Sequence, residues 1–181
     1  MQKAVLGGAL LGRMFPIYSL LSEATGLGDA AVFRSAWSVC GEKILLPKSK
    51  ISLEKQIKKI EPNVPELTDF DMLGTYPAID TATALLGMLH GLIAKDEQEF
   101  LNISKISQAS VARFIEYQLT VDGEIADNKA VREHPLMQYE IDVLAELIDF
   151  VEQMGRITSE NVKELKQLAV SDGQTNIGIA I

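Results

Sequence analysis

Polar side chains recur at helical spacing within the most apolar stretch of the chain, FDMLGTYPAIDTATALLGMLHGLI at 70–93. At ~100° per residue, six small or polar residues share one sector of a helix about 100° wide. We call them the polar seam: Tyr76, Asp80, Thr83, Gly87, His90 and Gly91. Asp80 could act as an acid or ligand group in a pocket, with Tyr76 beside it and Arg13 from another segment. His90 cannot form a dyad with Asp80, because ten helical residues rise by ~15 Å.

The glycines of the polar seam indicate that something approaches it closely. A glycine inside a helix costs about 1 kcal/mol relative to alanine. A packing explanation places the first helix there, because Ala4, Gly8 and Gly12 form a row of small residues that would let two helices cross near −50°. In the other explanation the seam is one wall of a pocket, and both remain open.

Other metal or nucleophile patterns in the chain are weak. Asp69 and Asp71 could join Asp80 as hard oxygen ligands for a divalent cation, but caps and turns explain these two acids equally well. Cys40 has no histidine nearby in sequence and fits a small core residue. The two histidines of the chain are too far apart for a zinc motif. We therefore predict no metal and no cofactor, and no catalytic constellation is recognisable.

The elements that would position these residues are all helices. Capping or breaking residues begin predicted helices at Asp29, Ser52, Asp96, Pro135 and Thr158, and Pro16 either starts a second helix or kinks the first. The pattern predicts an all-α single domain over 1–181, with seven or eight helices around a buried central helix at about 76–94. Residues 171–181, with alternating isoleucines, are expected to form an extended tail docked on the body or on a partner.

Composition limits the function classes. The chain has 181 residues, a net charge of −8 and a pI near 4.8, which makes nucleic acid an unlikely partner. One segment, 43–59, is basic, with six lysines against Glu54 alone. Uninterrupted apolar runs fall short of the ~18 residues of a membrane span, so we expect no membrane partner. The single cysteine fits a reducing compartment, and we expect the protein to be cytoplasmic.

Four stretches together resemble a known family. They are RMFPIY (13–18), TGLGD (25–29), FDMLGTYPAID (70–80) and NIGI (176–179), in this order. The chain resembles, over nearly its whole length, the YjaG-like family of bacterial domain-of-unknown-function proteins. The resemblance implies a compact helical bacterial protein and brings no established activity. In one departure, family members carry additional residues before the first helix, which here is predicted to begin almost at Met1.

The resemblance also suggests a polar site. Its marker positions lie in four separate segments: Arg13, Asp29, Tyr76, Asp80 and Asn176. If the fold brings them together they form a site with Thr83 and His90, and if it scatters them they are caps and structural groups. We expect a protein that acts through protein interaction or self-association as a homo-oligomer. The alternative is a small-molecule-binding or hydrolytic enzyme that uses the polar seam, with or without a divalent metal.

Overall fold

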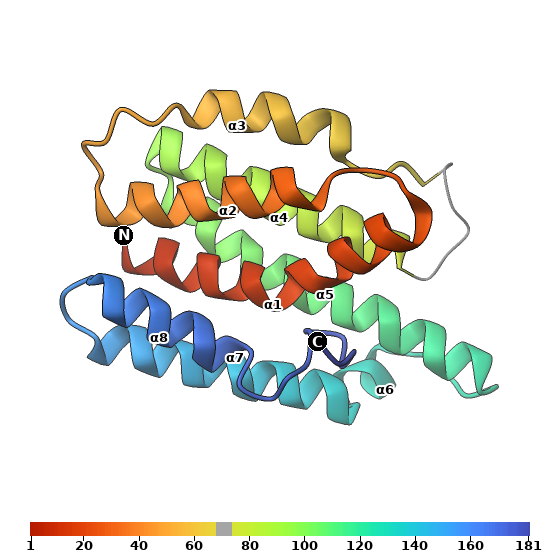
Figure 1. Cartoon of the computed structure of the whole chain (residues 1–181). Coiled ribbons are helices and arrows are strands. Elements are labelled where there is room, and N and C mark those ends of the chain that lie inside the picture. The colour runs from red at the N-terminus through yellow and green to blue at the C-terminus, as the bar shows by residue number, and fades with distance from the viewer. Residues whose placement is uncertain (68–73) are drawn as a thin grey trace.

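The described part of the chain is built from helices. The computed structural model describes residues 1–67 and 74–181, and within them it contains eight α-helices and one short 3-10 helix (Figure 1). They are α1 (Gln2–Thr25), α2 (Ala30–Leu45), α3 (Leu53–Ile60), η1 (Glu61–Asn63), α4 (Thr75–Ala94), α5 (Glu97–Val121), α6 (Asn128–Glu133), α7 (Pro135–Gln153) and α8 (Ser159–Ala169). The predicted all-α class is confirmed.

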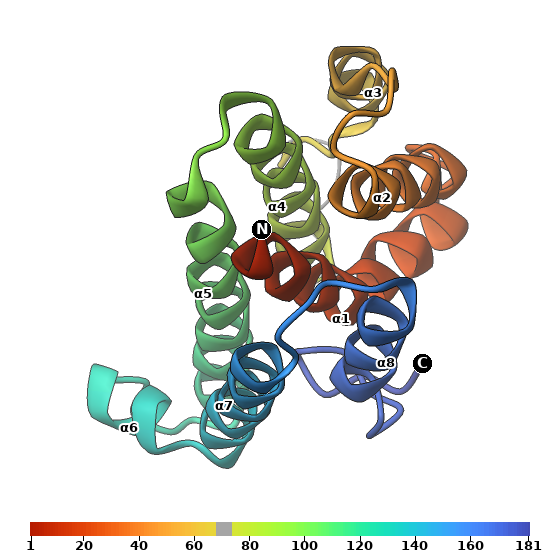
Figure 2. The same ribbon diagram turned by 90° about the vertical axis from the view of Figure 1, so that its left-hand side faces the viewer.

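Helix α1 lies at the centre of the bundle. It packs against α2, α4, α5, α7 and α8, and Figure 2 shows these helices around it. The helix runs continuously through Pro16, which therefore does not start a separate helix. Its residues from Ala4 to Leu11 are all buried, because neighbours cover every side of this segment.

Helix α4 closely matches the helix predicted at 76–94, but its place in the bundle differs from the prediction. It packs on α1, α2, α3 and α5, and it leaves Tyr76, Thr83 and His90 exposed. The prediction placed α4 at the centre because its sequence is apolar nearly all round. Helix α1 takes that position since its small residues admit close neighbours on more sides.

Both helices resemble membrane spans in length and composition. The sequence shows no uninterrupted apolar run of this length. Averaged along the helix, however, Gln2–Thr25 and Thr75–Ala94 are each long and apolar enough to cross a bilayer. In the most apolar window of α1, 78% of the residues are buried inside the protein, and in that of α4 the share is 50%. Core helices have this property as well, and the packing of α1 is that of a core helix.

The helix ends follow the capping residues read from the sequence. Asp29, Ser52, Asp96 and Thr158 each accept a hydrogen bond from a backbone N–H in the first turn of the following helix.

Cys40 is 1% exposed, so the prediction of a small core residue is confirmed.

The last twelve residues form a compact loop on the body. The Thr175 N–H donates to the Ile179 carbonyl at 2.8 Å, and the Ile181 N–H donates to the Gly173 carbonyl at 2.9 Å. Asn176 and Ile177 at the bend are buried. Ile177 joins a small apolar cluster with Ile17 of α1 and Ile115 of α5, separate from the main core. The loop thereby ties the C-terminal segment to two helices.

Candidate functional site

Arg13 holds a buried ion-pair network between α1 and the C-terminal third of the chain. Its side chain is 1% exposed. The Nε donates to Glu140 Oε2 on α7 at 2.9 Å, and Nη1 donates to Asp172 Oδ2 at 2.9 Å and to the Ala169 carbonyl at 3.0 Å. One guanidinium thus binds two carboxylates and the carbonyl at the end of α8, and its planar fork suits such a site.

Hydrogen bonds extend this network to α5 and to the C-terminal loop. The Ser107 hydroxyl donates to Glu140 Oε1 at 2.7 Å, and Asn176 Nδ2 donates to Ser107 Oγ at 3.2 Å. The backbone N–H of Asn176 donates to the Arg13 carbonyl at 3.3 Å. We call Arg13, Ser107, Glu140, Asp172 and Asn176 the Arg13 network. Its members come from α1, α5, α7 and the C-terminal segment, so it fixes these parts relative to one another.

The pKa values of the two carboxylates in the Arg13 network are shifted in opposite directions. Burial raises the pKa of Glu140 above its ordinary value, and the charge of Arg13 offsets part of that effect. For Asp172, burial is outweighed by hydrogen bonds from Arg13 and from the backbone N–H of Gln174, so its pKa is lowered. Asp172 is therefore the firmly ionised partner of Arg13, and Glu140 is the carboxylate that is costly to keep charged.

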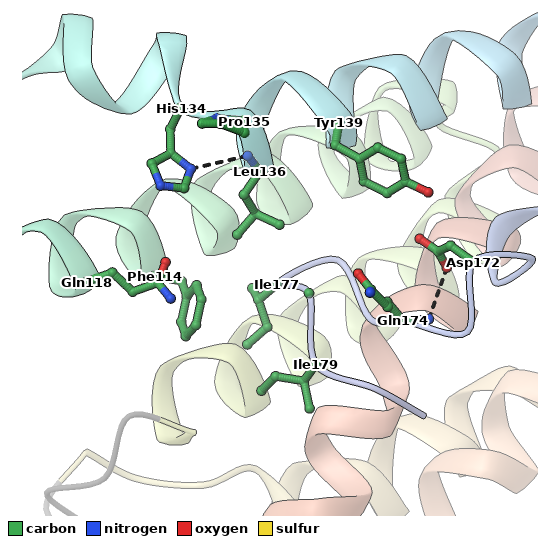
Figure 3. Close-up of a pocket in the computed structure, with 11 residues that line it drawn as sticks. Phe114, Gln118, His134, Pro135, Leu136, Tyr139, Asp172, Gln174, Ile177 and Ile179 are labelled. Carbon is green, nitrogen blue, oxygen red and sulfur yellow. Dashed lines mark hydrogen bonds between the residues drawn. The ribbon is translucent and has the colours of Figure 1, made fainter.

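A cavity of about 580 Å³ adjoins the Arg13 network between α5, α7 and the C-terminal loop (Figure 3). We call it the C-terminal cavity. Its lining is Phe114, Gln118, His134, Pro135, Leu136, Tyr139, Asp172, Gln174, Ile177, Gly178 and Ile179. In Figure 3 Leu136, Ile177 and Ile179 lie in its middle, with His134 at one end and Asp172 at the other. Cavities of this size and mixed lining are typical of binding sites.

Three polar side chains of the C-terminal cavity, those of His134, Tyr139 and Asp172, are already engaged in the fold. His134 Nδ1 accepts a hydrogen bond from the Leu136 N–H at 3.2 Å, as the cap of α7. Asp172 binds Arg13, and the Tyr139 ring lies 5.7 Å from the Arg13 guanidinium carbon. Burial and the neighbouring Asp172 carboxylate raise the pKa of Tyr139. The arrangement is suited to holding an apolar group beside a polar edge.

The polar seam of α4 meets α5. Asp80 accepts a hydrogen bond from Arg113 Nη1 at 2.7 Å, and the Arg113 guanidinium carbon lies 5.0 Å from the centre of the Tyr76 ring. A Cβ at Gly91 would stand 2.7 Å from the Phe100 ring of α5. The expected close approach is therefore present, but the packing explanation named the wrong helix. Burial raises the pKa of Asp80, and Arg113 opposes this shift.

The small-residue row of α1 receives a different neighbour. Trp37 of α2 donates from Nε1 to the Gly8 carbonyl at 2.8 Å, and its ring would be 2.8 Å from a Cβ at Gly12. Gly8 also faces the end of the Met88 side chain on α4. The row thus makes room for the single tryptophan of the chain, which sequence spacing alone could not indicate.

The structure separates the residues of the predicted polar site into groups. Arg13 and Asn176 share the Arg13 network, and Tyr76 and Asp80 share Arg113. Asp29 is the N-cap of α2, and its Oδ1 accepts from the Ala31 N–H at 2.8 Å. Thr83 and His90 are exposed on α4, where the Thr83 hydroxyl donates to the Ile79 carbonyl.

Sequence reasoning missed the partners of Arg13. Glu140, Asp172 and Ser107 were not predicted as site residues. Glu140 carried a usable signal, because it stands on the buried line of α7, three residues before Val143 and seven before Leu147. A carboxylate at such a position needs a buried cation.

The suggested metal ligands are only partly within the described structure. Asp69 and Asp71 lie outside the described residues. Among residues 1–67 and 74–181, histidine, cysteine and acidic side chains form no group of three that could hold a metal ion. Asp80, the third suggested ligand, has Arg113 as its partner.

These features define a single-domain helical bundle in which buried ion pairs and hydrogen bonds join the first helix to the C-terminal segment. The chain belongs to the family described as protein of unknown function (DUF416), whose model matches residues 1–180. It is 28% identical to the uncharacterized protein YjaG of Escherichia coli K12, over 98% of this chain and 90% of that protein. An uncharacterized protein of Haemophilus influenzae is also 28% identical, over 94% of this chain and 87% of that one.

A solved structure has the same fold. The crystal structure of a DUF416 family protein from Shewanella baltica OS155 superposes with a TM-score of 0.89 at 34% sequence identity. The match covers 99% of this chain and 93% of that one. The family resemblance read from the four sequence stretches is confirmed.

Proposed function

We propose that this protein acts through binding, and that it associates with a second copy of itself through the face that carries the C-terminal cavity. The observation that carries the proposal is an exposed apolar side chain beside an apolar hollow. Ile179 is 38% exposed and lines the cavity that Phe114, Leu136 and Ile177 also line. A two-fold interface brings the same patch of two copies together, so Ile179 of each copy would lie at the hollow of the other.

The apolar surface continues beyond the cavity along α5. Tyr117 is 50% exposed and Val121 is 65% exposed, and they follow Phe114 by three and seven residues on one side of the helix. Tyr139 of α7, also exposed, borders the cavity. Tyrosine is enriched in protein interfaces, where its ring contributes contact area and its hydroxyl remains paired.

The walls of this surface are held in advance of binding. The Arg13 network bonds Asp172 and Asn176 of the C-terminal segment to α1, and Ser107 of α5 to Glu140 of α7. A surface that is already ordered loses less conformational entropy on association. We place this self-association in the cytoplasm, where the one buried, unpaired cysteine would remain reduced.

Hydrogen exchange measured at low and at high micromolar protein concentration tests the location of the interface. We expect amides of 174–181 to exchange more slowly at high concentration, because association stabilises the bound form by mass action. Amides of α3, far from this face, serve as the internal reference. Exchange that is independent of concentration throughout 174–181 would contradict the proposal.

A further inference from the structure

A second cavity, of about 600 Å³, lies at the opposite end of α5 from the C-terminal cavity. We call it the lysine cavity. It is formed where α2 leads into α3 and where α4 leads into α5, at the end of the bundle that carries the N-terminus in Figure 1. Its volume is within the ~300–1,000 Å³ of small-molecule sites. The proposed self-association does not involve it.

The inner lining of the lysine cavity is apolar. Leu53 of α3 and Phe100 of α5 are buried at its base, at 3% and 4% exposure. Ile51 and Leu92 are partly buried, and Ile93, 39% exposed, stands at its mouth. An aliphatic body placed here would remove these side chains from water, which favours binding in proportion to the area covered.

Among the three cations that line the lysine cavity within the described chain, the Lys95 ammonium alone has no partner, since the N-terminal ammonium of Met1 lies 3.8 Å from Glu97 Oε1. Glu54 accepts a hydrogen bond from the Ser52 hydroxyl at 3.1 Å, and Glu97 binds Lys3 Nζ at 2.7 Å. Lys43 Nζ donates to the Ser49 carbonyl at 2.7 Å. The Lys95 backbone N–H donates to the Gly91 carbonyl as the cap of α4. Within the described chain its side chain makes no hydrogen bond or ion pair, so its ammonium is free to bind an anion.

The backbone of Lys95 adds a second reason to assign it a binding role. Its φ of 56° makes it the one residue other than glycine with positive φ among the described residues. This position is the left-handed cap of α4, where glycine or asparagine is favoured. A lysine there carries a cost to the fold, and costs of this kind gather at functional sites.

The first three lysines of the basic segment at 43–59 lie at or beside the lysine cavity. Lys43 lines the cavity, and Lys48 and Lys50 flank Pro47 and Ile51, two further lining residues. A local excess of positive charge in a chain of net charge −8 attracts anions to this end of the molecule.

We propose that the lysine cavity binds an amphipathic small-molecule anion, a carboxylate on an aliphatic chain, whose head pairs with Lys95 and whose chain lies on Leu53, Leu92 and Phe100. Decanoate is a suitable probe, and decanol has the same chain length with a neutral head. Calorimetric titration of the full chain is expected to show decanoate binding about three- to fivefold more tightly than decanol, the ratio of a partly exposed ion pair.

Variants of Lys95 separate the charge from the fold. Lys95→Gly is expected to reduce the affinity for decanoate to that for decanol, while the unfolding temperature stays equal or rises, because glycine suits a φ of 56°. Lys95→Arg keeps the charge and should keep the affinity. Unchanged decanoate affinity in Lys95→Gly, or equal affinities for decanoate and decanol in the unmodified chain, would overturn the proposal.

A second pair of variants tests the location. Ile93→Glu places a carboxylate at the mouth of the cavity and should abolish decanoate binding, whereas Ile148→Glu, at a similarly exposed position on α7, should not. Equal loss in both variants would overturn the assignment. Sedimentation with phosphatidylglycerol vesicles, in a protein that does not bind free decanoate, would also overturn it in favour of a lipid surface.

Discussion

Arg13 illustrates how one charge in the core depends on its partners. Its side chain and that of Glu140 are 1% and 2% exposed and form an ion pair. Arg13 also donates to the Ala169 carbonyl, and Glu140 also accepts from the Ser107 hydroxyl. Because removal of one member of a buried pair leaves the other unpaired, we predict that Arg13→Met lowers the free energy of unfolding by about 3–5 kcal/mol. Urea denaturation measures this loss.

Two further variants control this prediction. Arg13→Met with Glu140→Met should be less destabilised than Arg13→Met alone, since the fully buried carboxylate of Glu140 is no longer left without a partner and only Asp172, which is 15% exposed, loses its own. Arg113→Met breaks the ion pair with Asp80. Because the Arg113 side chain is 42% exposed, this variant should lower the free energy of unfolding by only about 1 kcal/mol. Equal losses for Arg13→Met and Arg113→Met would show that the Arg13 network is not an important source of stability.

Asp172 predicts a dependence of stability on pH. Its pKa is lower in the folded protein than in the unfolded chain, so its contribution is present above the unfolded value near ~3.9 and is lost as the pH falls through the folded value. Burial raises the pKa of Glu140, which gives the opposite sign. Glu140 is present in both proteins, and only the smaller contribution of the Asp172 charge to its pKa enters the comparison. We therefore expect the stability difference between the unmodified chain and Asp172→Asn to shrink from about pH 6 to about pH 3.

Urea midpoints of both proteins across this pH range provide the measurement. Asp149→Asn, at an exposed position on α7, is the matched control and should show little difference from the unmodified chain at any pH. A constant difference between Asp172→Asn and the unmodified chain would mean that the ionised form of Asp172 is not what Arg13 stabilises.

At the scale of the elements, two helical glycines are expected to respond in opposite ways to alanine. A Cβ at Gly12 would stand 2.8 Å from the Trp37 ring, so Gly12→Ala should lower the free energy of unfolding by about 1–3 kcal/mol. A Cβ at Gly87 would meet only the end of the Glu99 side chain at 3.4 Å, so Gly87→Ala should gain about 0.5–1 kcal/mol. Thermal or urea unfolding distinguishes the two, and destabilisation by both variants would contradict this account of the helix contacts.

Local signals explain why the elements could be read from sequence while their neighbours could not. A cap such as Asp29 or Asp96 acts within one turn, so its effect is visible in a few residues. The contact of the polar seam with α5 depends on how whole helices cross. Both Gly12 and Gly91 signal close approach, but the partners, Trp37 and Phe100, lie on other helices at unrelated positions in the chain.

At the scale of the whole molecule, the sequence predicted the fold class, the helix number and the family, and it predicted two of the five members of the Arg13 network. Arg13 and Asn176 are the first and last members of the Arg13 network. Ser107, Glu140 and Asp172 complete it. The two acidic residues were missed because carboxylates in an amphipathic helix and in a polar turn look like surface residues. Long-range pairing over more than a hundred residues leaves little trace in local spacing.

The central proposal is self-association through the C-terminal face, and the mass of the protein in solution tests it most directly. Light scattering on a concentration series should show the unmodified chain approaching twice its 19.8 kDa mass. Ile179→Asp should remain at the monomer mass, and Leu27→Asp, a matched change in an exposed loop between α1 and α2, should still associate. A monomer mass for the unmodified chain at every concentration, or equal association of all three proteins, would contradict the account.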